Sequence, residues 1–458
     1  MNDNNTRAEV CDSFRPGDEL SLYAEDFTIR GAAVAKIKAA GAQGRSTVVF
    51  VDGAVPGDTV TARITAVKKF GLLAEAVRVD TPSVHRVPPD CPDFSRCGGC
   101  VFRAMDYSGE LAVKAGWVRQ ALERIGRVSP EIRPIVPSPQ VYGYRNNVRL
   151  HIAKAPDGTL QAGFYGKSPP GLFIPRRCQL LSESMDTLRT RCMELISGVP
   201  AEFAGTEHIS LRESGVDGQL LFSLTGSKLP RKQALDALYS ALRETIPALA
   251  GIGAETKTDG RSRMFCVGEK YIRQELLGVS FLVGHDTFFQ INGPQAENLF
   301  RTALDLACPG KNNRVLDLYC GIGVLSLLVA KRVSLVTGIE INPAATAAAK
   351  RCAAMNGIGN AAFLTGDAAK AASLLPEPHR NPDVVFLDPP RAGCAPPLLT
   401  SIAELSPERV VYISCDPATL ARDAGRLGGL GYAAVTAQPL DMFPGCPHVE
   451  TALLLAKQ

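Results

Sequence analysis

Apolar and polar residues alternate in short segments near the start of the chain, and this pattern predicts β-strands. Turn signals such as Pro16-Gly17-Asp18 and Pro56-Gly57-Asp58 separate the segments. Alternation with a period of two buries one face of a strand and exposes the other. The segments occupy residues 19–23, 31–37, 47–51, 59–67 and 72–79. Five short strands in about 65 residues predict a small β-barrel of the OB type, a scaffold that often binds oligonucleotides.

From residue 288 onwards the pattern changes to short, continuously apolar runs separated by helical segments. The runs occupy residues 314–318, 335–339, 383–387 and 410–413; a further short strand leads to Asp367, and a last one covers 448–455. Strands that are buried on both faces and alternate with helices are typical of a parallel sheet in an α/β fold. The C-terminal part is therefore predicted to be a Rossmann-like α/β domain.

The middle of the chain has mixed α+β patterns. An amphipathic helix is predicted at 110–127, with Trp117, Leu122 and Ile125 on related faces, and a strand at 142–152. The helix is expected to pack on the C-terminal domain. The chain is thus predicted to comprise four parts, which are a disordered tail (1–14), the barrel (15–80), a central domain (81–285) and the α/β domain (286–458).

The apolar run at 410–413 is followed by Ser414 and Cys415, where a strand passes into a helix. Asp416 is predicted to cap this helix and Pro417 to occupy its first position. Backbone N–H groups at a helix N-terminus stabilise an anion, so the thiol of Cys415 is expected to ionise more easily than a free cysteine. Most single cysteines are packing residues. Cys415, however, lies where open α/β sheets bind ligands, which makes it a candidate nucleophile.

Glycines follow the strand at 314–318, and an acid follows the next strand. Gly321 and Gly323 lie in the first turn, and Glu340 comes nineteen residues after Gly321. Glycines allow the backbone to approach a nucleotide closely, and an acid at the second strand's end binds ribose hydroxyls. A dinucleotide site would have a third glycine at position 326, which is Ser326. The pattern therefore favours a nucleoside-type cofactor over NAD.

The chain contains thirteen cysteines, an odd number that does not suit a disulfide framework. Cys91, Cys97 and Cys100 have the spacing C-x5-C-x2-C in a segment rich in proline and glycine, and Cys178 is the best candidate for a fourth ligand. Zinc and an iron–sulfur cluster both fit such a set. The spacing therefore predicts a metal centre and leaves the metal open.

Charge and hydropathy limit the partners of this protein. The net charge of +4 permits local contacts with nucleic acid but does not itself indicate them. Arg145, Asn147, Arg149 and His151 alternate along the strand at 142–152, and such a polar, basic strip suits either an RNA backbone or an exposed sheet face. No apolar run approaches the roughly 18 residues of a membrane span, and the start lacks a signal peptide's apolar segment. We expect a cytoplasmic monomer with no membrane partner and no evident protein partner.

Five motifs at these positions together resemble those of the RNA uracil-5-methyltransferases. They are FFQIN (288–292), DLYCG (317–321), DPPR (388–391), SCDP (414–417) and MFP (442–444), and the last is followed by Glu450. The N-terminal barrel resembles a TRAM domain, and the cysteine set resembles the [4Fe–4S] site of the branch that modifies 23S ribosomal RNA. The resemblance covers nearly the whole chain.

The resemblance implies an S-adenosylmethionine-dependent enzyme that methylates C5 of a uridine in RNA, most closely 23S ribosomal RNA. It implies that Cys415 is the nucleophile, that Glu450 is the base, and that Asp388 lines both the cofactor and the target base. The residues implied to contact S-adenosylmethionine are Gln290, Tyr319, Gly321, Glu340, Asp367 and Asp388. Those implied to bind the [4Fe–4S] cluster are Cys91, Cys97, Cys100 and Cys178.

Uracil chemistry accounts for these residue types. C5 of uracil is too weak a nucleophile to accept a methyl group unaided, but addition of the Cys415 thiolate to C6 turns the ring into an enolate that is nucleophilic at C5. Glu450 would then remove the C5 proton. The alternatives are a transfer-RNA uridine-5-methyltransferase, an RNA cytosine-5-methyltransferase and a non-catalytic RNA-binding protein. Motifs of the cytosine class are not evident, and binding alone would need neither Cys415 nor Glu450.

Overall fold

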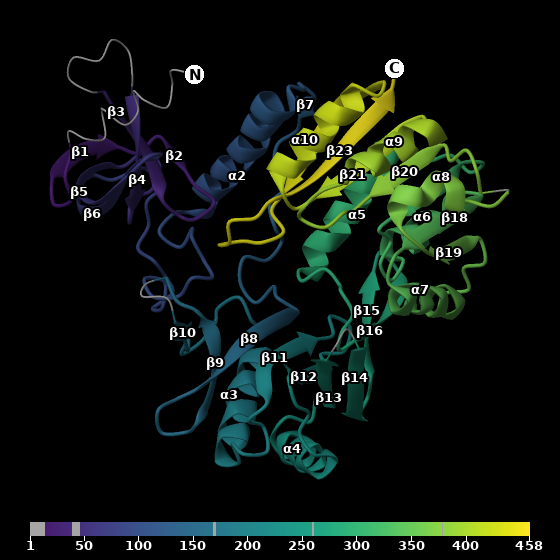
Figure 1. Ribbon diagram of the computed structural model, residues 1–458, viewed down its shortest axis with the longest axis horizontal. Helices are drawn as coiled ribbons and strands as arrows, with labels where there is room; N and C mark the ends of the chain where they lie inside the picture. Colours follow the sequence, from purple (N-terminus) through teal and green to yellow (C-terminus); the bar gives the residue numbers. More distant parts are fainter. Residues whose placement is uncertain (1–13, 39–45, 168–170, 259–260, 378) are drawn as a thin grey trace. The chain divides into compact units, whose positions relative to one another are not determined.

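The computed structural model describes residues 14–38, 46–167, 171–258, 261–377 and 379–458 (Figure 1). Packing divides the chain into two units. The first comprises residues 1–116 and 445–448, and the second comprises residues 117–444 and 449–458. The tail predicted at 1–14 lies, except for residue 14, outside the described residues. No helix within the described ranges is long and apolar enough to cross a membrane.

A six-stranded sheet forms most of the first unit. Its strands are β1 (Glu19–Tyr23), β2 (Asp26–Phe27), β3 (Ala33–Lys38), β4 (Ser46–Asp52), β5 (Thr59–Lys68) and β6 (Gly71–Thr81), paired in the order β1-β5-β6-β4-β3-β2. The alternating apolar residues of β4 and β5, such as Val49 and Val60, are fully buried. All five predicted strands are present, and only β2 was not anticipated. Closure of this sheet into a barrel stays a prediction.

A buried ion pair holds the end of the first unit together. Helix α2 (Tyr107–Ala121) begins in this unit, and the ammonium of its Lys114 donates to Glu110 at 2.6 Å. The same Glu110 carboxylate accepts the backbone N–H of Gly445 at 2.7 Å. The Lys114 side chain is completely buried and the Glu110 side chain is 5% exposed. The pair therefore ties the loop at 445–448 to α2.

The predicted helix at 110–127 is in fact α2 followed by a π-helical turn, η1 (Leu122–Gly126). Leu122 is buried, but Ile125 is 52% exposed, so the prediction of one amphipathic helix with these residues on related faces holds for Leu122 and not for Ile125. Helix α10 (Pro417–Gly428) packs on η1. A Cβ atom on Gly126 would lie 2.6 Å from the carbonyl oxygen of Ala421, so glycine permits this close packing.

A seven-stranded sheet occupies the centre of the chain, within the second unit. Its strands are β8 (Asn147–Lys154), β9 (Leu160–Tyr165), β10 (Leu172–Phe173), β11 (Thr206–Glu213), β12 (Leu220–Gly226), β13 (Leu249–Thr258) and β14 (Arg261–Gly268), in the order β10-β9-β8-β11-β12-β13-β14. Helices α3 (Glu183–Gly198) and α4 (Lys232–Thr245) share one apolar core with this sheet. β8 begins at Asn147, later than predicted, because the preceding backbone bonds instead to Gln179, Leu180 and Ile291.

The C-terminal part of the second unit is a mixed eight-stranded sheet. Its strands are β7 (Glu131–Ile132), β17 (Arg314–Leu318), β18 (Leu335–Glu340), β19 (Ala361–Thr365), β20 (Val384–Leu387), β21 (Arg409–Ser414), β22 (Tyr432–Leu440) and β23 (Glu450–Lys457). Their order is β19-β18-β17-β20-β21-β23-β22-β7. The five strands from β19 to β21 are parallel, whereas β23 is antiparallel to both neighbours. β22 and β7 were not predicted.

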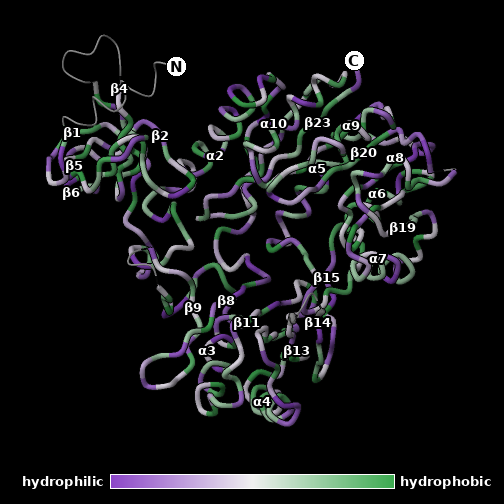
Figure 2. Tube along the Cα trace, in the orientation of Figure 1, coloured by the Kyte–Doolittle hydropathy of each residue, from purple (hydrophilic) through white to green (hydrophobic). Residues whose placement is uncertain are grey.

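Helices cover both faces of this sheet, as the doubly wound prediction requires. One apolar core joins the sheet to α5 (Gly293–Ala307), α6 (Val324–Ala330) and α7 (Pro343–Met355). The other joins it to α8 (Ala371–Leu374), α9 (Pro396–Leu405) and α10. Hydrophobic segments recur along the chain in Figure 2. A separate hairpin, β15 (Tyr271–Leu276) with β16 (Val279–Gly284), precedes the sheet in sequence. The strand order reverses between β17 and β20, the point at which such folds bind ligands.

Candidate active site

The predicted nucleophile and base meet at one edge of the C-terminal sheet. The carboxyl ends of the parallel strands β20 and β21 lie at this edge, and β23, running the opposite way, begins there. Ser414 pairs with Thr451, so the same register continued by one residue places Cys415 opposite Glu450. Asp388, the residue after β20, follows at the same edge.

The backbone around Cys415 has the predicted geometry. Asp416 caps α10, and its carboxylate accepts the N–H of Thr419 at 2.9 Å. Pro417 is the first helical residue. The Ser414 hydroxyl accepts the N–H of Asp416 at 3.2 Å, which fixes the turn between strand and helix.

The prediction that Cys415 ionises easily was wrong. Burial, and next the charge of Glu450, raise the pKa of the Cys415 thiol to about 11, although Arg391 opposes them. The stabilisation that a helix N-terminus offers is small because its field falls off within one turn. Removal of the thiol from water and the adjacent carboxylates therefore outweigh it. In the free protein near neutral pH, Cys415 is a thiol.

Both carboxyl groups beside Cys415 have raised pKa values. Glu450 is 4% exposed, and burial together with the charge of Asp388 raises its pKa to about 8. Burial raises the pKa of Asp388 to about 7. The Arg391 guanidinium lowers the pKa of both Glu450 and Cys415, which places a positive charge near them. Two carboxyl groups that exchange protons near neutral pH thus lie beside the Cys415 thiol, an arrangement typical of active sites.

The turn after β17 has the form of a nucleotide-binding loop. Tyr319 has a positive φ of 65°, a strained conformation for a non-glycine residue, and Gly321 follows with φ 55°. A Cβ atom on Gly321 would meet nothing within 4 Å, so the space above this glycine is open. Glu340, at the end of β18, accepts the N–H groups of Gly321 at 3.2 Å and Asn342 at 2.8 Å. The loop and Glu340 therefore fit a nucleoside whose ribose hydroxyls bind the carboxylate.

Ser326 has a structural reason to replace the third glycine of a dinucleotide site. Its hydroxyl donates to the buried carboxylate of Asp317. Burial, and secondarily the nearby Asp388 and Glu340, raise the pKa of Asp317 to about 7. A glycine at 326 would remove this hydroxyl donor and leave the carboxyl only the backbone N–H of residue 326.

Gln290 and Asp367, the two other predicted cofactor contacts, have different surroundings. Gln290 is buried, and its backbone carbonyl accepts the side-chain amide of Asn146 at 2.9 Å. Asp367 is exposed after β19, and its carboxylate caps the turn η2 (Ala368–Lys370) by accepting the N–H of Ala369 at 3.0 Å. Its cofactor role stays a prediction.

The four predicted metal ligands are partly buried cysteines. The Cys97 sulfur accepts the N–H of Gly99 at 3.4 Å. Cys100 shares a hydrogen bond with Cys446, and this bond together with burial raises the pKa of Cys100. Across the described residues, no three His, Cys, Asp or Glu side chains are placed to hold a metal ion. Four thiols suit an iron–sulfur centre chemically.

Arg391 is the residue of this site to which the sequence assigned no role. The signal was its place in the DPPR motif, directly after the two prolines that follow β20. Its backbone carbonyl accepts the Thr419 hydroxyl at 3.2 Å, which ties the motif to α10 beside Cys415.

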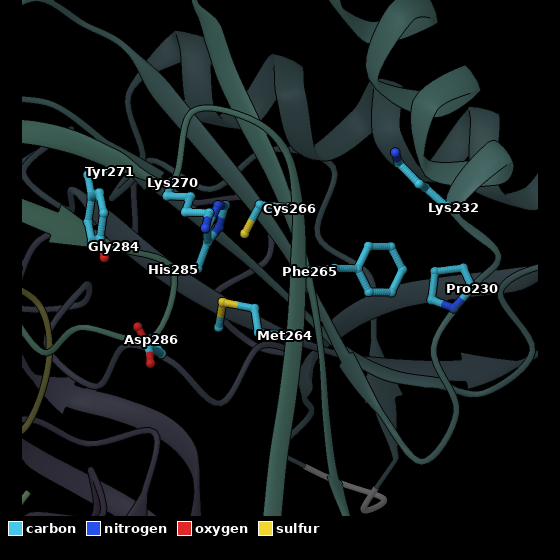
Figure 3. Close-up of a pocket in the computed structure, with 10 residues that line it drawn as sticks. All are labelled: Pro230, Lys232, Met264, Phe265, Cys266, Lys270, Tyr271, Gly284, His285 and Asp286. Carbon is cyan, nitrogen blue, oxygen red and sulfur yellow. The ribbon is translucent and has the colours of Figure 1, made fainter. Parts of the chain in front are cut away.

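A separate cavity of about 750 Å³ lies against the central sheet (Figure 3). Met264, Phe265 and Cys266 of the edge strand β14 line it, with Cys266 on the side of His285 and Lys270, and Phe265 towards Pro230. None of the predicted catalytic, cofactor or metal residues lines this cavity.

Comparisons with known proteins agree with this geometry. The family described as tRNA (Uracil-5-)-methyltransferase matches residues 232–458, and the TRAM domain matches residues 16–77. A protein of Thermosynechococcus vestitus described as an uncharacterized RNA methyltransferase is 36% identical over 422 residues, which cover 89% of this chain and 93% of the relative. One of Halalkalibacterium halodurans with the same description is 33% identical over 454 residues, covering 96% and 97%.

A solved structure resembles nearly the whole chain. The Pyrococcus abyssi tRNA (uracil-54, C5)-methyltransferase, in complex with S-adenosyl-L-homocysteine, matches with a TM-score of 0.71 and 25% sequence identity. The match covers 95% of this chain and 100% of that structure.

Proposed function

This chain belongs to the tRNA (uracil-5-)-methyltransferase family and carries a TRAM domain, and on this premise we propose that it methylates C5 of a uridine in RNA through a covalent bond to Cys415. The observation that carries the proposal is the convergence of Cys415, Glu450 and Asp388 at one edge of the sheet. A thiol nucleophile and a proton acceptor side by side are what this reaction needs and what RNA binding alone does not.

S-adenosylmethionine would supply the methyl group, as an electrophile that C5 can attack. Residues at the ends of β17, β18 and β20 would bind it. Glu340 would accept the ribose hydroxyls, and the open space over Gly321 would allow close approach of the backbone. Tyr319, Gln290, Asp367 and Asp388 complete the proposed contacts.

Cys415 would add to C6 of the uracil, so its proton must leave as the carbon–sulfur bond forms. With a pKa of about 11, the thiol does not lose this proton on its own near neutral pH. Asp388, whose pKa of about 7 allows it to accept a proton, is the proposed acceptor. The positive charge of Arg391 would offset the negative charge that develops on the sulfur during transfer.

Glu450 would complete the cycle after methyl transfer. C5 then carries both the new methyl group and a hydrogen. Removal of this proton by Glu450 re-forms the C5–C6 double bond and expels the Cys415 sulfur. A pKa of about 8 makes Glu450 a stronger base than an ordinary carboxylate once it is ionised. The target base must leave its stack to reach these residues.

We propose 23S ribosomal RNA as the substrate, with transfer RNA as the second candidate. Ribosomal RNA is favoured by the TRAM domain together with the cysteine set. Transfer RNA is favoured by the solved enzyme, which is named for a transfer-RNA uridine and matches 95% of this chain. That match spans nearly all of the chain. The domains that precede the methyltransferase domain therefore do not by themselves decide between ribosomal RNA and transfer RNA.

Methyl transfer to unmodified large-subunit ribosomal RNA and to unmodified transfer RNA, at one salt concentration, tests this proposal. Mapping of the product should place 5-methyluridine in the ribosomal RNA. If the protein prefers transfer RNA, the proposed substrate is wrong but the proposed methylation of uridine C5 still stands. Methylation of cytosine, or of no RNA, would overturn the function.

We also propose that Cys91, Cys97, Cys100 and Cys178 bind one [4Fe–4S] cluster. Four thiols with ligand-like spacing support it, as does the amide N–H that the Cys97 sulfur accepts. Metal binding is coupled to folding, so convergence of the four thiols would accompany loading of the cluster. The proposed domains stay those given by the sequence, at 15–80, 81–285 and 286–458.

A further inference from the structure

The two faces of the central sheet differ in what covers them. Val148, Leu150 and Ile209 point into the apolar core shared with α3 and α4. The opposite face is polar. Register pairs Asn147 with Arg212, Arg149 with Ser210 and His151 with His208, so all six side chains lie on that face.

Three aromatic rings meet on this polar face, where β8, β9 and β11 adjoin. The rings of His151 and Tyr165 have centroids 4.3 Å apart, and those of His151 and His208 lie 4.8 Å apart. Tyr165 is 62% exposed. A single exposed tyrosine is ordinary. An exposed tyrosine that packs on His151, which in turn contacts His208, offers instead a ready-made surface for a further ring.

A cation lies beside this aromatic cluster. Arg149 is exposed and forms no ion pair with any residue that the structure describes. Burial, and next the charges of Arg149 and His151, lower the pKa of His208. His208 therefore stays neutral near pH 7, and Arg149 supplies the positive charge. The charge of Glu207 opposes this shift of the His208 pKa but is the smallest of the causes.

We propose that Tyr165, His151 and His208, with Arg149, form a stacking site for an unpaired base of the RNA, distinct from the site of the methylated uridine. The choice of RNA as the ligand rests on the proposed function. Splayed bases stack on tyrosine and histidine rings, and an arginine beside them binds the phosphate. A polar sheet face with exposed aromatic rings is a common platform for single-stranded RNA.

The position of this site identifies the base as a flanking one. Asn146, which precedes β8, donates its backbone N–H to Ile291 at 2.8 Å and its side-chain amide to Gln290, within the cofactor motif. His151 lies four residues along the strand from Asn147, about 13 Å at 3.3 Å per residue. A base stacked there would lie that far along the strand from the contact with the FFQIN motif, so we assign it to a nucleotide next to the one that Cys415 attacks. The site would hold this neighbouring nucleotide while the target is unstacked.

Binding of a short, fluorescein-labelled single-stranded RNA of mixed sequence to the full-length protein tests this site. Loss of one base–aromatic stack corresponds to about 1–3 kcal/mol, so Tyr165→Ala should weaken binding roughly 5- to 140-fold. Tyr165→Phe keeps the ring and should bind within about twofold of wild type. Tyr271→Ala removes another partly exposed tyrosine of the same unit, outside this face, and is the matched control.

Salt dependence separates stacking from charge. Arg149→Ala should make the plot of log affinity against log salt shallower by about 0.7, because one phosphate contact is lost. Tyr165→Ala should lower affinity without changing this slope. S-adenosylmethionine binding, measured by calorimetry, should be unchanged in both variants.

Wild-type RNA affinity in Tyr165→Ala, or equal losses in Tyr165→Ala and Tyr271→Ala, would overturn the stacking site even if the enzyme methylates uridine. Conversely, a Tyr165-dependent loss of RNA binding by a protein that methylates no RNA would support the site while the proposed reaction failed. The two proposals therefore fail separately.

Discussion

Glu450 stands opposite Cys415 across the pair of strands β21 and β23, and its charge raises the pKa of the thiol. Two negative charges this close repel each other, so ionising both the Cys415 thiol and the Glu450 carboxyl in the free protein is energetically unfavourable. The thiol proton must therefore move when the substrate binds. A site that keeps its nucleophile protonated until then protects the sulfur from unwanted reactions, because only the thiolate is reactive.

Cys415 should form a covalent bond with RNA that carries 5-fluorouridine at the target position. With S-adenosylmethionine present, addition and methyl transfer can occur, but fluorine cannot leave as a proton does, so the complex should persist in a denaturing gel. Cys415→Ser should trap nothing, whereas Cys308→Ser, which changes an exposed cysteine, should trap like the wild type. Trapping by Cys415→Ser would show that another group is the nucleophile.

Glu450→Gln should slow the release of product more than the formation of the adduct. Loss of a general base typically reduces the rate about 10²–10⁴-fold, so covalent RNA–protein complex should accumulate even with ordinary uridine. Glu408→Gln changes an exposed glutamate and is the control. If Glu450→Gln turns over at the wild-type rate, the base lies elsewhere.

Stability should depend on pH through Glu450. Its pKa is about 8 in the folded protein and about 4.5 when unfolded, so the folded state holds the proton more tightly between these values. Glu450 therefore lowers the free energy of unfolding least below pH 4.5, and it lowers it increasingly as the pH rises to 8. Glu450→Gln should raise the free energy of unfolding at pH 8.5 by several kcal/mol, and by much less at pH 5, at about 1.4 kcal/mol per unit of pKa difference. Denaturant titrations at both pH values measure this, and a gain that is equal at the two pH values would contradict it.

Lys114→Met should destabilise the first unit by about 3–5 kcal/mol, because it removes the ammonium that pairs with the buried Glu110 carboxylate. Trp117, the only tryptophan, lies on the same helix, so its fluorescence can follow the denaturation of α2. Arg63→Met breaks a half-exposed ion pair with Glu19 and should cost no more than about 1 kcal/mol. Similar losses in the two variants would mean that burial does not set the strength of the Lys114 pair.

Protein purified without oxygen should be brown and contain about four irons per chain if the cysteine set binds a [4Fe–4S] cluster. Cys97→Ser should remove the colour, and Cys308→Ser should keep it. Stoichiometric zinc without iron would show that these cysteines bind zinc and not an iron–sulfur cluster.

Much of this protein follows from short stretches of sequence. Strands β1 and β17 begin and end at the predicted residues, and Asp416 caps α10 as its place before Pro417 indicates. Apolar periodicity, turn residues and helix caps act through neighbours along the chain, so they can be read without knowing the fold. The motifs likewise located Cys415, Asp388 and Glu450.

Tertiary structure alone decided how these residues behave. Local sequence predicts an easily ionised Cys415, but the pKa depends on burial and on Glu450, which lies 35 residues later in the chain and arrives through an antiparallel strand. The aromatic cluster of His151, Tyr165 and His208 likewise needs three strands in one register. Electrostatic and packing energies depend on distance in space and on exclusion of water, and neither is set by the order of residues along the chain.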